Sequence, residues 1–134
     1  MLKATGASGI AALLTADIEA DVERVLIARD RDVLRADVLI VPHHGNRTLS
    51  TEPFLDAVWP RAAVFQVGYR NRFHHPNPTV FARYPVRSIP LARSDDGAVR
   101  IDIGSEIVLE RYRDTRALLG WGADHNRDKE AASA

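Results

Sequence analysis

The pattern of hydrophobic and polar positions predicts a series of strands along the chain. Short apolar runs at residues 11–15, 37–41 and 62–67 are each closed by turn or loop residues. Such uninterrupted runs are typical of strands that lie in a sheet covered by helices. Further along, residues 99–103 and 107–109 alternate apolar with polar side chains. This period of two predicts an antiparallel hairpin with one buried face.

Other segments have the pattern of helices. Apolar residues recur at helical spacing, with charged residues between them, at Ile18, Val22, Val25 and Leu26. A second helix is expected over residues 52–58, with Ser50 or Thr51 as its N-cap. A third begins at Asn77-Pro78 and ends at Pro85. The order of elements therefore predicts an α/β fold in which a mixed β-sheet with flanking helices is followed by a C-terminal antiparallel hairpin.

Length and composition limit the chain to one ordinary domain. It has 134 residues, of which 46% are hydrophobic and 27% charged, close to globular averages. We expect residues 1–114 to form the domain and the polar, alanine-rich residues 115–134 to be a disordered tail. The longest uncharged stretch, Ala4–Ala16, is shorter than the roughly 18 residues that a membrane span requires. The absence of cysteine excludes disulfides, cysteine-ligated metals and cysteine nucleophiles.

The net charge is zero, but the charges are unevenly distributed. Between Asp56 and Asp95 there is no acidic residue, and six arginines lie there: Arg61, Arg70, Arg72, Arg83, Arg87 and Arg93. Arginine is well suited to bidentate contacts with phosphate. This stretch is therefore either a phosphate-binding surface or an ordinary solvated, arginine-rich face.

Residues that could carry chemistry follow the first two apolar runs, where α/β folds place their sites. Asp17 follows the first run and is either a metal ligand or a helix N-cap. His43 and His44 follow the second run, and Gly45 after them permits a close approach of backbone or ligand. Because neutral histidine is a common metal ligand, these two side chains predict a metal site, the alternative being a turn with hydrogen-bonding histidines.

A third candidate segment, residues 68–78, follows the third apolar run. It contains Arg70 and Arg72, which suit phosphate, and Tyr69 and Phe73, which suit stacking on nucleic-acid bases. Its histidines, including His75, could hold a proton or a metal ion. The alternative is a long surface loop that is held in place by Phe73.

Taken together, three blocks resemble the C-terminal part of ComEC-type DNA-internalisation competence proteins, a metallo-β-lactamase-like domain. The blocks are LLTADIEADVERVL, LRADVLIVPHHGNRTLS and VFQVGYRNRFHHPNPTVFAR, and the similarity covers about residues 10–112. The resemblance implies two β-sheets between helices. It also implies that this chain is the second half of such a domain, a partial metallo-β-lactamase-like fold.

The resemblance also implies roles for individual residues. Asp17 matches a metal-bridging acid, and one of His43 and His44 matches a further metal ligand. His75 and Arg72 match a third family block, where catalytic contacts to a substrate phosphate are expected. The implied activity is that of a nuclease, dependent on a divalent metal such as Mn²⁺ or Zn²⁺, which degrades the DNA strand that is not transported.

Departures from the family pattern qualify this expectation. No histidine precedes His43, so the main upstream metal motif of the family is absent. Ala16 and His74 stand where the family usually has glycine. We therefore expect at most a weak, incomplete metal site and an inactive fragment, since a catalytic zinc needs about three protein ligands.

The same resemblance implies partners and a location. The partners are single-stranded DNA, the missing N-terminal half of the domain and the membrane channel of the parent protein, with no small-molecule cofactor. The parent would lie in the inner membrane, whereas this fragment would itself be soluble. Two alternatives remain: a non-catalytic single-stranded DNA-binding or structural module, and a half-domain whose exposed apolar surface favours dimers.

Overall fold

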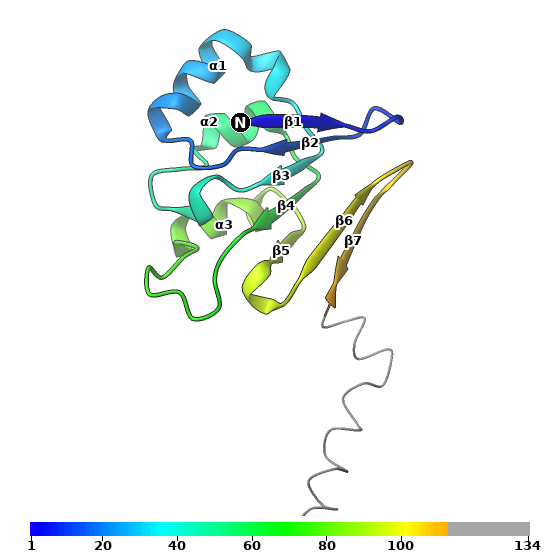
Figure 1. Cartoon of the computed structure of the whole chain (residues 1–134). Coiled ribbons are helices and arrows are strands. Elements are labelled where there is room, and N and C mark those ends of the chain that lie inside the picture. The colour runs from blue at the N-terminus through cyan, green and yellow to red at the C-terminus, as the bar shows by residue number, and fades with distance from the viewer. Residues whose placement is uncertain (113–134) are drawn as a thin grey trace, which may run out of the picture.

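The computed structural model describes residues 1–112, and Figure 1 shows their arrangement. The predicted tail, residues 115–134, lies outside the described residues. One sheet contains five strands in the order of the sequence: β1 (Leu2–Thr5), β2 (Ala11–Leu14), β3 (Val38–Ile40), β4 (Ala62–Phe65) and β5 (Leu91–Arg93). Strands β2 to β5 are parallel, and β1 pairs with β2 in the antiparallel sense, so the sheet is mixed as predicted.

Three helices connect the parallel strands, and a separate hairpin follows them. The helices are α1 (Ala20–Leu34), α2 (Glu52–Val58) and α3 (Pro78–Val86), with short 3₁₀ turns η1 (Pro42–Gly45) and η2 (Ser94–Asp96) after β3 and β5. The antiparallel hairpin consists of β6 (Val99–Ile103) and β7 (Ile107–Arg111) and lies apart from the helices in Figure 1. The α/β class and the C-terminal hairpin are thus confirmed.

The core lies between the sheet and the helices. Leu13, Leu39 and Phe65 lie on neighbouring strands and are buried with Phe54 of α2 and Tyr84 of α3. The ring of Phe65 meets the ring of Tyr84 edge-on at a centroid distance of 5.1 Å. Burial of these large side chains is the main contribution to the stability of the layer, at about 1.5–3 kcal/mol for each.

The hairpin lies beside β5 and the start of β4, and the Arg111 guanidinium donates to the Leu91 carbonyl at 2.7 Å. Ile107 and Leu109 of β7 line a cavity of about 240 Å³ together with Ala62 and Leu91 of the main sheet. Because Ile107 and Leu109 point to the same side of β7, the alternating pattern identified the face of the hairpin that turns inward.

Most predicted elements agree with the structure to within a residue or two. Helix α2 has the predicted bounds, and the Thr51 hydroxyl accepts the Phe54 N–H at 3.4 Å as its N-cap. Helix α3 begins after Asn77, whose side chain accepts the Thr79 N–H at 3.0 Å. The predicted end at Pro85 is one residue early, because Pro85 lies in the last turn.

Helix α1 differs from its predicted amphipathic pattern. Val22 and Val25 were expected on the buried face, but both are exposed. The side chain of Glu23 is buried in their place, at 0% exposure. Its carboxylate accepts hydrogen bonds from the backbone N–H groups of Ser50 and Thr51, at 2.8 and 3.0 Å, and from the Thr51 hydroxyl. Leu26 of α1 and Ile18 just before it pack against the core as predicted, so the inward side of α1 combines apolar residues with the hydrogen-bonded carboxylate of Glu23.

Candidate functional site: a histidine cluster beside an arginine and aromatic loop

The turn after β3 brings His43 and His44 to the carboxyl edge of the sheet. Both residues have positive φ, 43° and 59°, and Gly45 after them has φ 79°. The His43 N–H donates to the Ala16 carbonyl at 3.0 Å, and the Gly45 carbonyl accepts the Asn77 N–H at 2.9 Å. The turn is therefore tied to the chain segments that follow β2 and precede α3.

The loop after β4 is held in shape by Asn71. The Asn71 side-chain amide donates to the His75 carbonyl at 2.9 Å, and its oxygen accepts the His75 N–H at 2.8 Å. At the base of the loop, the Ser94 hydroxyl bonds to both the N–H and the carbonyl of Val67, each at 2.8 Å. These contacts fix the position of His75 relative to the end of the sheet.

Three histidines from these two segments form a cluster. The ring centroids of His43 and His44 are 6.0 Å apart, and the His75 centroid is 6.3 Å from each of them. His44 Nδ1 contacts the Gln66 carbonyl, which joins the end of β3 to the end of β4. A pocket of about 250 Å³ is lined by His44, Val67, Gly68, Asn71, Phe73 and His75. The sequence places each of these segments directly after an apolar run, and the structure brings the three histidines together.

The surroundings of His75 lower its pKa below the ordinary value of 6.5. Partial burial is the larger cause, and the neighbouring positive charges of His44 and His43 add to it. The neutral form of His75 is therefore favoured near pH 7, where its ring can both accept and donate a hydrogen bond.

We expect this pKa to be visible in the pH dependence of folding. Because the folded pKa is lowered, the unfolded chain binds more protons as the pH falls through the range just below 6.5, and stability decreases there. Above pH 6.5 the contribution of His75 is constant. Denaturant titrations at pH 7 and pH 5 should show a smaller difference for His75→Gln than for the unchanged chain, and NMR should place the His75 pKa below 6.5. A measured value at or above 6.5 would contradict the expected lowering of the His75 pKa by burial and by its neighbours.

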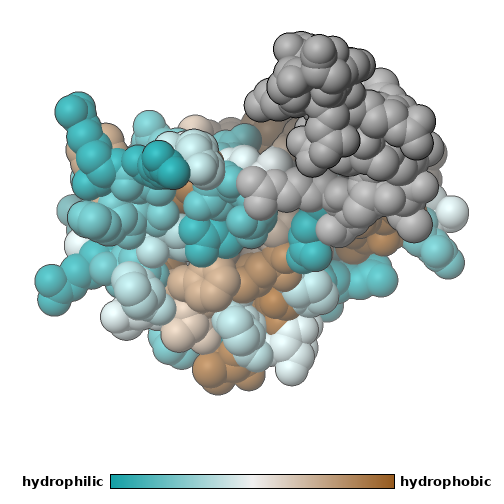
Figure 2. Space-filling view, turned by 90° about the horizontal axis from the view of Figure 1, so that it is seen from below, coloured by the Kyte–Doolittle hydropathy of each residue, from teal (hydrophilic) through white to brown (hydrophobic). Residues whose placement is uncertain are grey.

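An exposed column of cations and rings continues from His75. The Phe73 ring stacks on the His75 ring at a centroid distance of 6.0 Å, and the Arg72 guanidinium lies 5.2 Å from the Phe73 centroid. Arg70 lies over the Tyr69 ring at the same distance. Phe73 is 65% exposed and Tyr69 70% exposed, so Phe73 does not hold the loop in place by burial. Figure 2, a view from the lower end of Figure 1, shows apolar side chains among hydrophilic ones on this end of the molecule.

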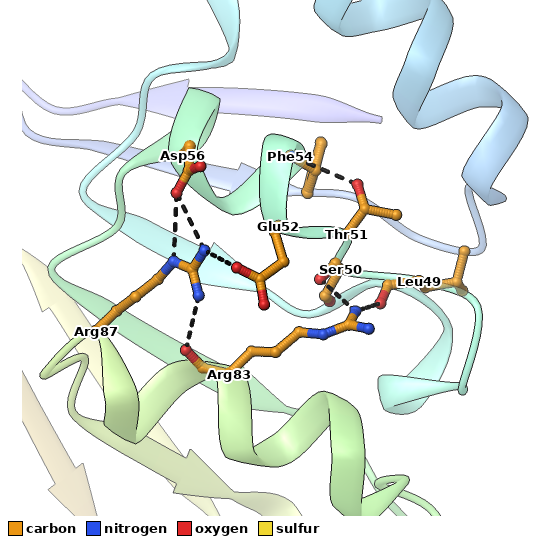
Figure 3. Close-up of polar contacts among 8 residues, drawn as sticks. All are labelled: Leu49, Ser50, Thr51, Glu52, Phe54, Asp56, Arg83 and Arg87. Atoms are coloured by element: carbon orange, nitrogen blue, oxygen red, sulfur yellow. Dashed lines mark hydrogen bonds and ion pairs between the residues drawn. The ribbon is translucent and has the colours of Figure 1, made fainter.

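Most of the arginines in the acid-free stretch have structural partners. Arg83 donates to the carbonyls of Leu49 and Ser50 at 3.0 and 2.9 Å, and Arg87 pairs with Glu52 and Asp56, as Figure 3 shows. Arg93 pairs with Asp95 at 2.6 Å, and Arg61 lies 3.8 Å from Asp37.

Arg70 and Arg72 differ from these four. Both are exposed, and within residues 1–112 neither forms an ion pair. The interpretation of the stretch as a solvated face is therefore inaccurate for Arg83, Arg87 and Arg93. The arginines of this stretch that remain candidates for binding phosphate are Arg70 and Arg72.

Asp17 follows a residue whose backbone contacts the turn of His43 and His44. It is exposed, and the residue before it, Ala16, accepts the His43 N–H at 3.0 Å. The N-cap of α1 is Glu19, so the alternative interpretation of Asp17 as the cap is wrong. The Asp17 side chain makes no hydrogen bond or ion pair with the described residues, which leaves its carboxylate open to solvent.

The described residues do not supply a complete metal site. Among them, no group of three or more histidine, aspartate or glutamate side chains is arranged to hold a metal ion. The three histidines lie together and Asp17 follows the residue that bonds to His43, but a role of these four residues as metal ligands does not follow from this geometry alone.

Sequence reasoning gave no role to Asn71 and Ser94, which shape the loop after β4. Gly45, which shapes the histidine turn, was identified as a position of close approach. A Cβ on Gly45 would lie 2.7 Å from Phe65 Cε1 and 2.8 Å from Pro76 Cβ. The signals in the sequence were the Asn between two arginines and the Gly directly after the histidines, both typical of tight turns.

The chain is similar in sequence to several known proteins. No family model matches the chain. It is 37% identical over 99 residues, 73% of its length, to "Competence protein ComA" of Neisseria gonorrhoeae, and 33% identical over 87 residues, 65% of its length, to "ComE operon protein 3" of Bacillus subtilis (strain 168). The chain is homologous to the ComEC-type competence proteins.

The homology covers a small part of each relative. The chain spans 14% of the Neisseria competence protein and 11% of the Bacillus protein. An "Uncharacterized protein YcaI" of Escherichia coli (strain K12) is 35% identical over 75 residues, which are 56% of this chain and 10% of that protein. Within the described part of this competence-protein homologue, no helix is both long and apolar enough to cross a membrane.

Proposed function

We propose that this chain is a DNA-contacting part of a DNA-uptake protein and that the loop of Tyr69–His75 binds single-stranded DNA. Two relatives are named as competence or ComE proteins, which supports a role in DNA uptake. The observation that carries the proposal is the column of Arg72, Phe73 and His75, in which Arg72 and Phe73 are exposed. In the whole protein, this part would act beside a membrane channel in the inner membrane.

The chemistry of the loop fits a single strand better than a duplex. Tyr69 and Phe73 expose ring faces on which unpaired bases can stack, and stacking is tolerant of sequence. Arg70 and Arg72, which have no carboxylate partner within residues 1–112, offer guanidinium groups to the phosphates. Neutral His75 can add a hydrogen bond to a phosphate oxygen or a base edge. Because the chain is neutral overall, binding is expected to be weak and local.

Fluorescence anisotropy with a labelled oligothymidylate tests this proposal. Phe73→Ala is expected to weaken binding about tenfold, since one stacked base contributes about 1–3 kcal/mol. Arg70→Ala and Arg72→Ala are each expected to reduce the slope of log affinity against log salt by about one.

Arg29→Ala is the matched control, because it removes an exposed arginine of α1 that lies 3.8 Å from Asp30. It should leave both the affinity and the salt slope unchanged. Equal effects of Arg29→Ala and Arg72→Ala would show only a general charge effect and would contradict a binding site at the loop.

A second candidate function is part of a metal-dependent nuclease centre. The convergence of His43, His44 and His75 at one edge, with the open carboxylate of Asp17 nearby, favours it. The described residues do not fit a complete metal site, so the remaining ligands would have to come from elsewhere in the full-length protein. Mn²⁺ or Zn²⁺ would be the metal, and this chain alone is expected to be inactive.

A titration of the chain with Zn²⁺, followed through the histidine ring signals by NMR, tests this candidate. Selective shifts are expected for His75 and for at least one of His43 and His44. The internal control is His74, which is exposed, is adjacent to His75 in sequence and makes no ring contact with the cluster. A shift of the His74 ring signals as large as that of the His75 signals would contradict a partial metal site. The absence of a shift in any histidine ring would contradict it as well.

A further inference from the structure

Trp59 has an unusual position at the end of α2. It is the C-cap of the helix, with φ 50° and ψ 57°, and its N–H donates to the Leu55 carbonyl at 2.8 Å. Glycine is the usual residue in this left-handed conformation, because a side chain is disfavoured there. The indole is 66% exposed, so burial in the core does not account for the residue.

Two cavities meet at Trp59. One, of about 230 Å³, is lined by Leu55, Pro60, Ile89 and their neighbours, and the other, of about 420 Å³, is lined by Lys3, Arg35 and Arg61 among others. Trp59 lines both, so a ligand in either cavity would lie next to this residue.

This region lies at the edge of the sheet opposite to the histidine cluster. Arg61 directly precedes β4, whereas the loop with Phe73 and His75 follows β4. Asp37 likewise precedes β3, and His43 follows it. A ligand at Trp59 would therefore occupy a different surface from DNA bound at the loop.

The larger cavity carries more positive than negative groups. Its cations are Lys3, Arg35 and Arg61, and its acids are Asp32 and Asp37. One oxygen of Asp37 accepts the Ala11 N–H at 2.9 Å, and the other lies 3.8 Å from Arg61, so this acid is already compensated.

Arg35 is the cation best placed to act together with the indole. Its guanidinium lies 5.9 Å from the centre of the Trp59 ring, and within the described chain it forms no ion pair. The Lys3 ammonium donates to the Val33 carbonyl at 3.1 Å, which leaves it further donors for an anion.

We propose that Trp59, Arg35 and Lys3 form a second binding site whose ligand is a nucleotide unit, with its base against the indole and its phosphate at the cations. An exposed ring beside the guanidinium of Arg35, which forms no ion pair within residues 1–112, matches a ligand that joins a flat aromatic base to an anion. The ligand is either a free nucleotide or one unit of a nucleic-acid strand. The site does not depend on the proposed role of the loop.

The emission of Trp59 itself reports on this site. The chain has two tryptophans, Trp59 and Trp121, so Trp121→Phe leaves Trp59 as the sole reporter. Thymidine monophosphate and an oligothymidylate serve as the two probes. Quenching by both would assign a site that accepts the free nucleotide, and quenching by the oligomer alone would assign a site for the strand.

Variants of the reporter chain separate this site from the loop. Arg35→Ala should weaken the quenching roughly fivefold or more, because it removes the guanidinium beside the ring. Arg29→Ala, within the helix that Arg35 caps, should leave it unchanged, and Asp32→Asn should strengthen it. Arg70→Ala combined with Arg72→Ala should also leave it unchanged, even where binding at the loop is lost.

Two results would overturn the proposal. The first is the absence of quenching by either probe. The second is quenching that Arg35→Ala does not weaken, or that disappears with the loop variants. If Trp59 quenching persists while loop variants have no effect on DNA affinity, the proposed function fails and the second site remains.

Discussion

Replacement of Glu23 with alanine is expected to lower the free energy of unfolding by about 3–5 kcal/mol. The Glu23 carboxylate is fully buried and accepts three hydrogen bonds from Ser50 and Thr51. Alanine would leave these donors without an acceptor at the start of α2 and would open a cavity between α1 and α2. Urea unfolding measures the loss directly.

Two further variants show whether the hydrogen bonds are the cause. Glu23→Gln keeps one acceptor oxygen and should recover part of the lost stability. Val22→Ala, at the exposed neighbouring position, should change stability by less than about 0.5 kcal/mol. A Glu23→Ala chain as stable as the Val22→Ala chain would contradict the role of this carboxylate.

The same region connects all three helices. The Ser50 hydroxyl accepts a hydrogen bond from the Tyr84 hydroxyl at 2.8 Å. Arg83 donates to the Leu49 and Ser50 carbonyls. Burial raises the pKa of Tyr84 well above its ordinary value, so its hydroxyl remains a donor throughout the range in which the chain would be studied. Loss of Glu23 is therefore expected to loosen the segment that leads from the histidine turn into α2.

Replacement of Gly45 with alanine is expected to destabilise the chain by about 2–4 kcal/mol. The new methyl group would lie 2.7 Å from Phe65 Cε1 and 2.8 Å from Pro76 Cβ, and the backbone has φ 79°. Since Phe65 is in the core and Pro76 follows His75, relief of the clash would displace the histidines relative to one another. Urea unfolding and the histidine ring signals should both change.

Gly9→Ala is a matched control for the conformational part of this effect. Gly9 has φ 85°, close to that of Gly45, but a Cβ there would meet no atom within 4 Å. It should therefore cost only the roughly 1–2 kcal/mol of the left-handed conformation and leave the histidine signals unchanged. Equal losses for the two variants would show that the clash at Gly45 is relieved without moving the site.

Much of the fold could be predicted because the spacing of apolar residues reflects which side chains are buried. The runs that became β2, β3 and β4 and the alternation in β6 and β7 identified strands correctly. Strands β1 and β5 were not predicted. All four residues of β1 are exposed and β5 has three residues, so neither has the apolar signal of a buried strand.

The site could be predicted in part for a similar reason. The carboxyl ends of parallel strands meet at one edge, so the convergence of His43, His44 and His75 followed from topology. The partners of Arg83 and Arg87 could not be predicted in this way. They are Leu49, Ser50, Glu52 and Asp56, which are far from these arginines in sequence. The folded chain brings Arg83 and Arg87 to these partners, whereas among the described residues Arg70 and Arg72 form no ion pair.

The most direct test of the account is a titration of the ¹⁵N-labelled chain with oligothymidylate, followed by NMR. We expect salt-sensitive shifts of backbone and side-chain signals at Tyr69–His75. These shifts should extend to His44, which lines the same pocket as His75. Residues of α1 near Arg29 should not shift. The absence of selective shifts in this loop, with or without changes elsewhere, would contradict the claim that this edge of the sheet contacts DNA.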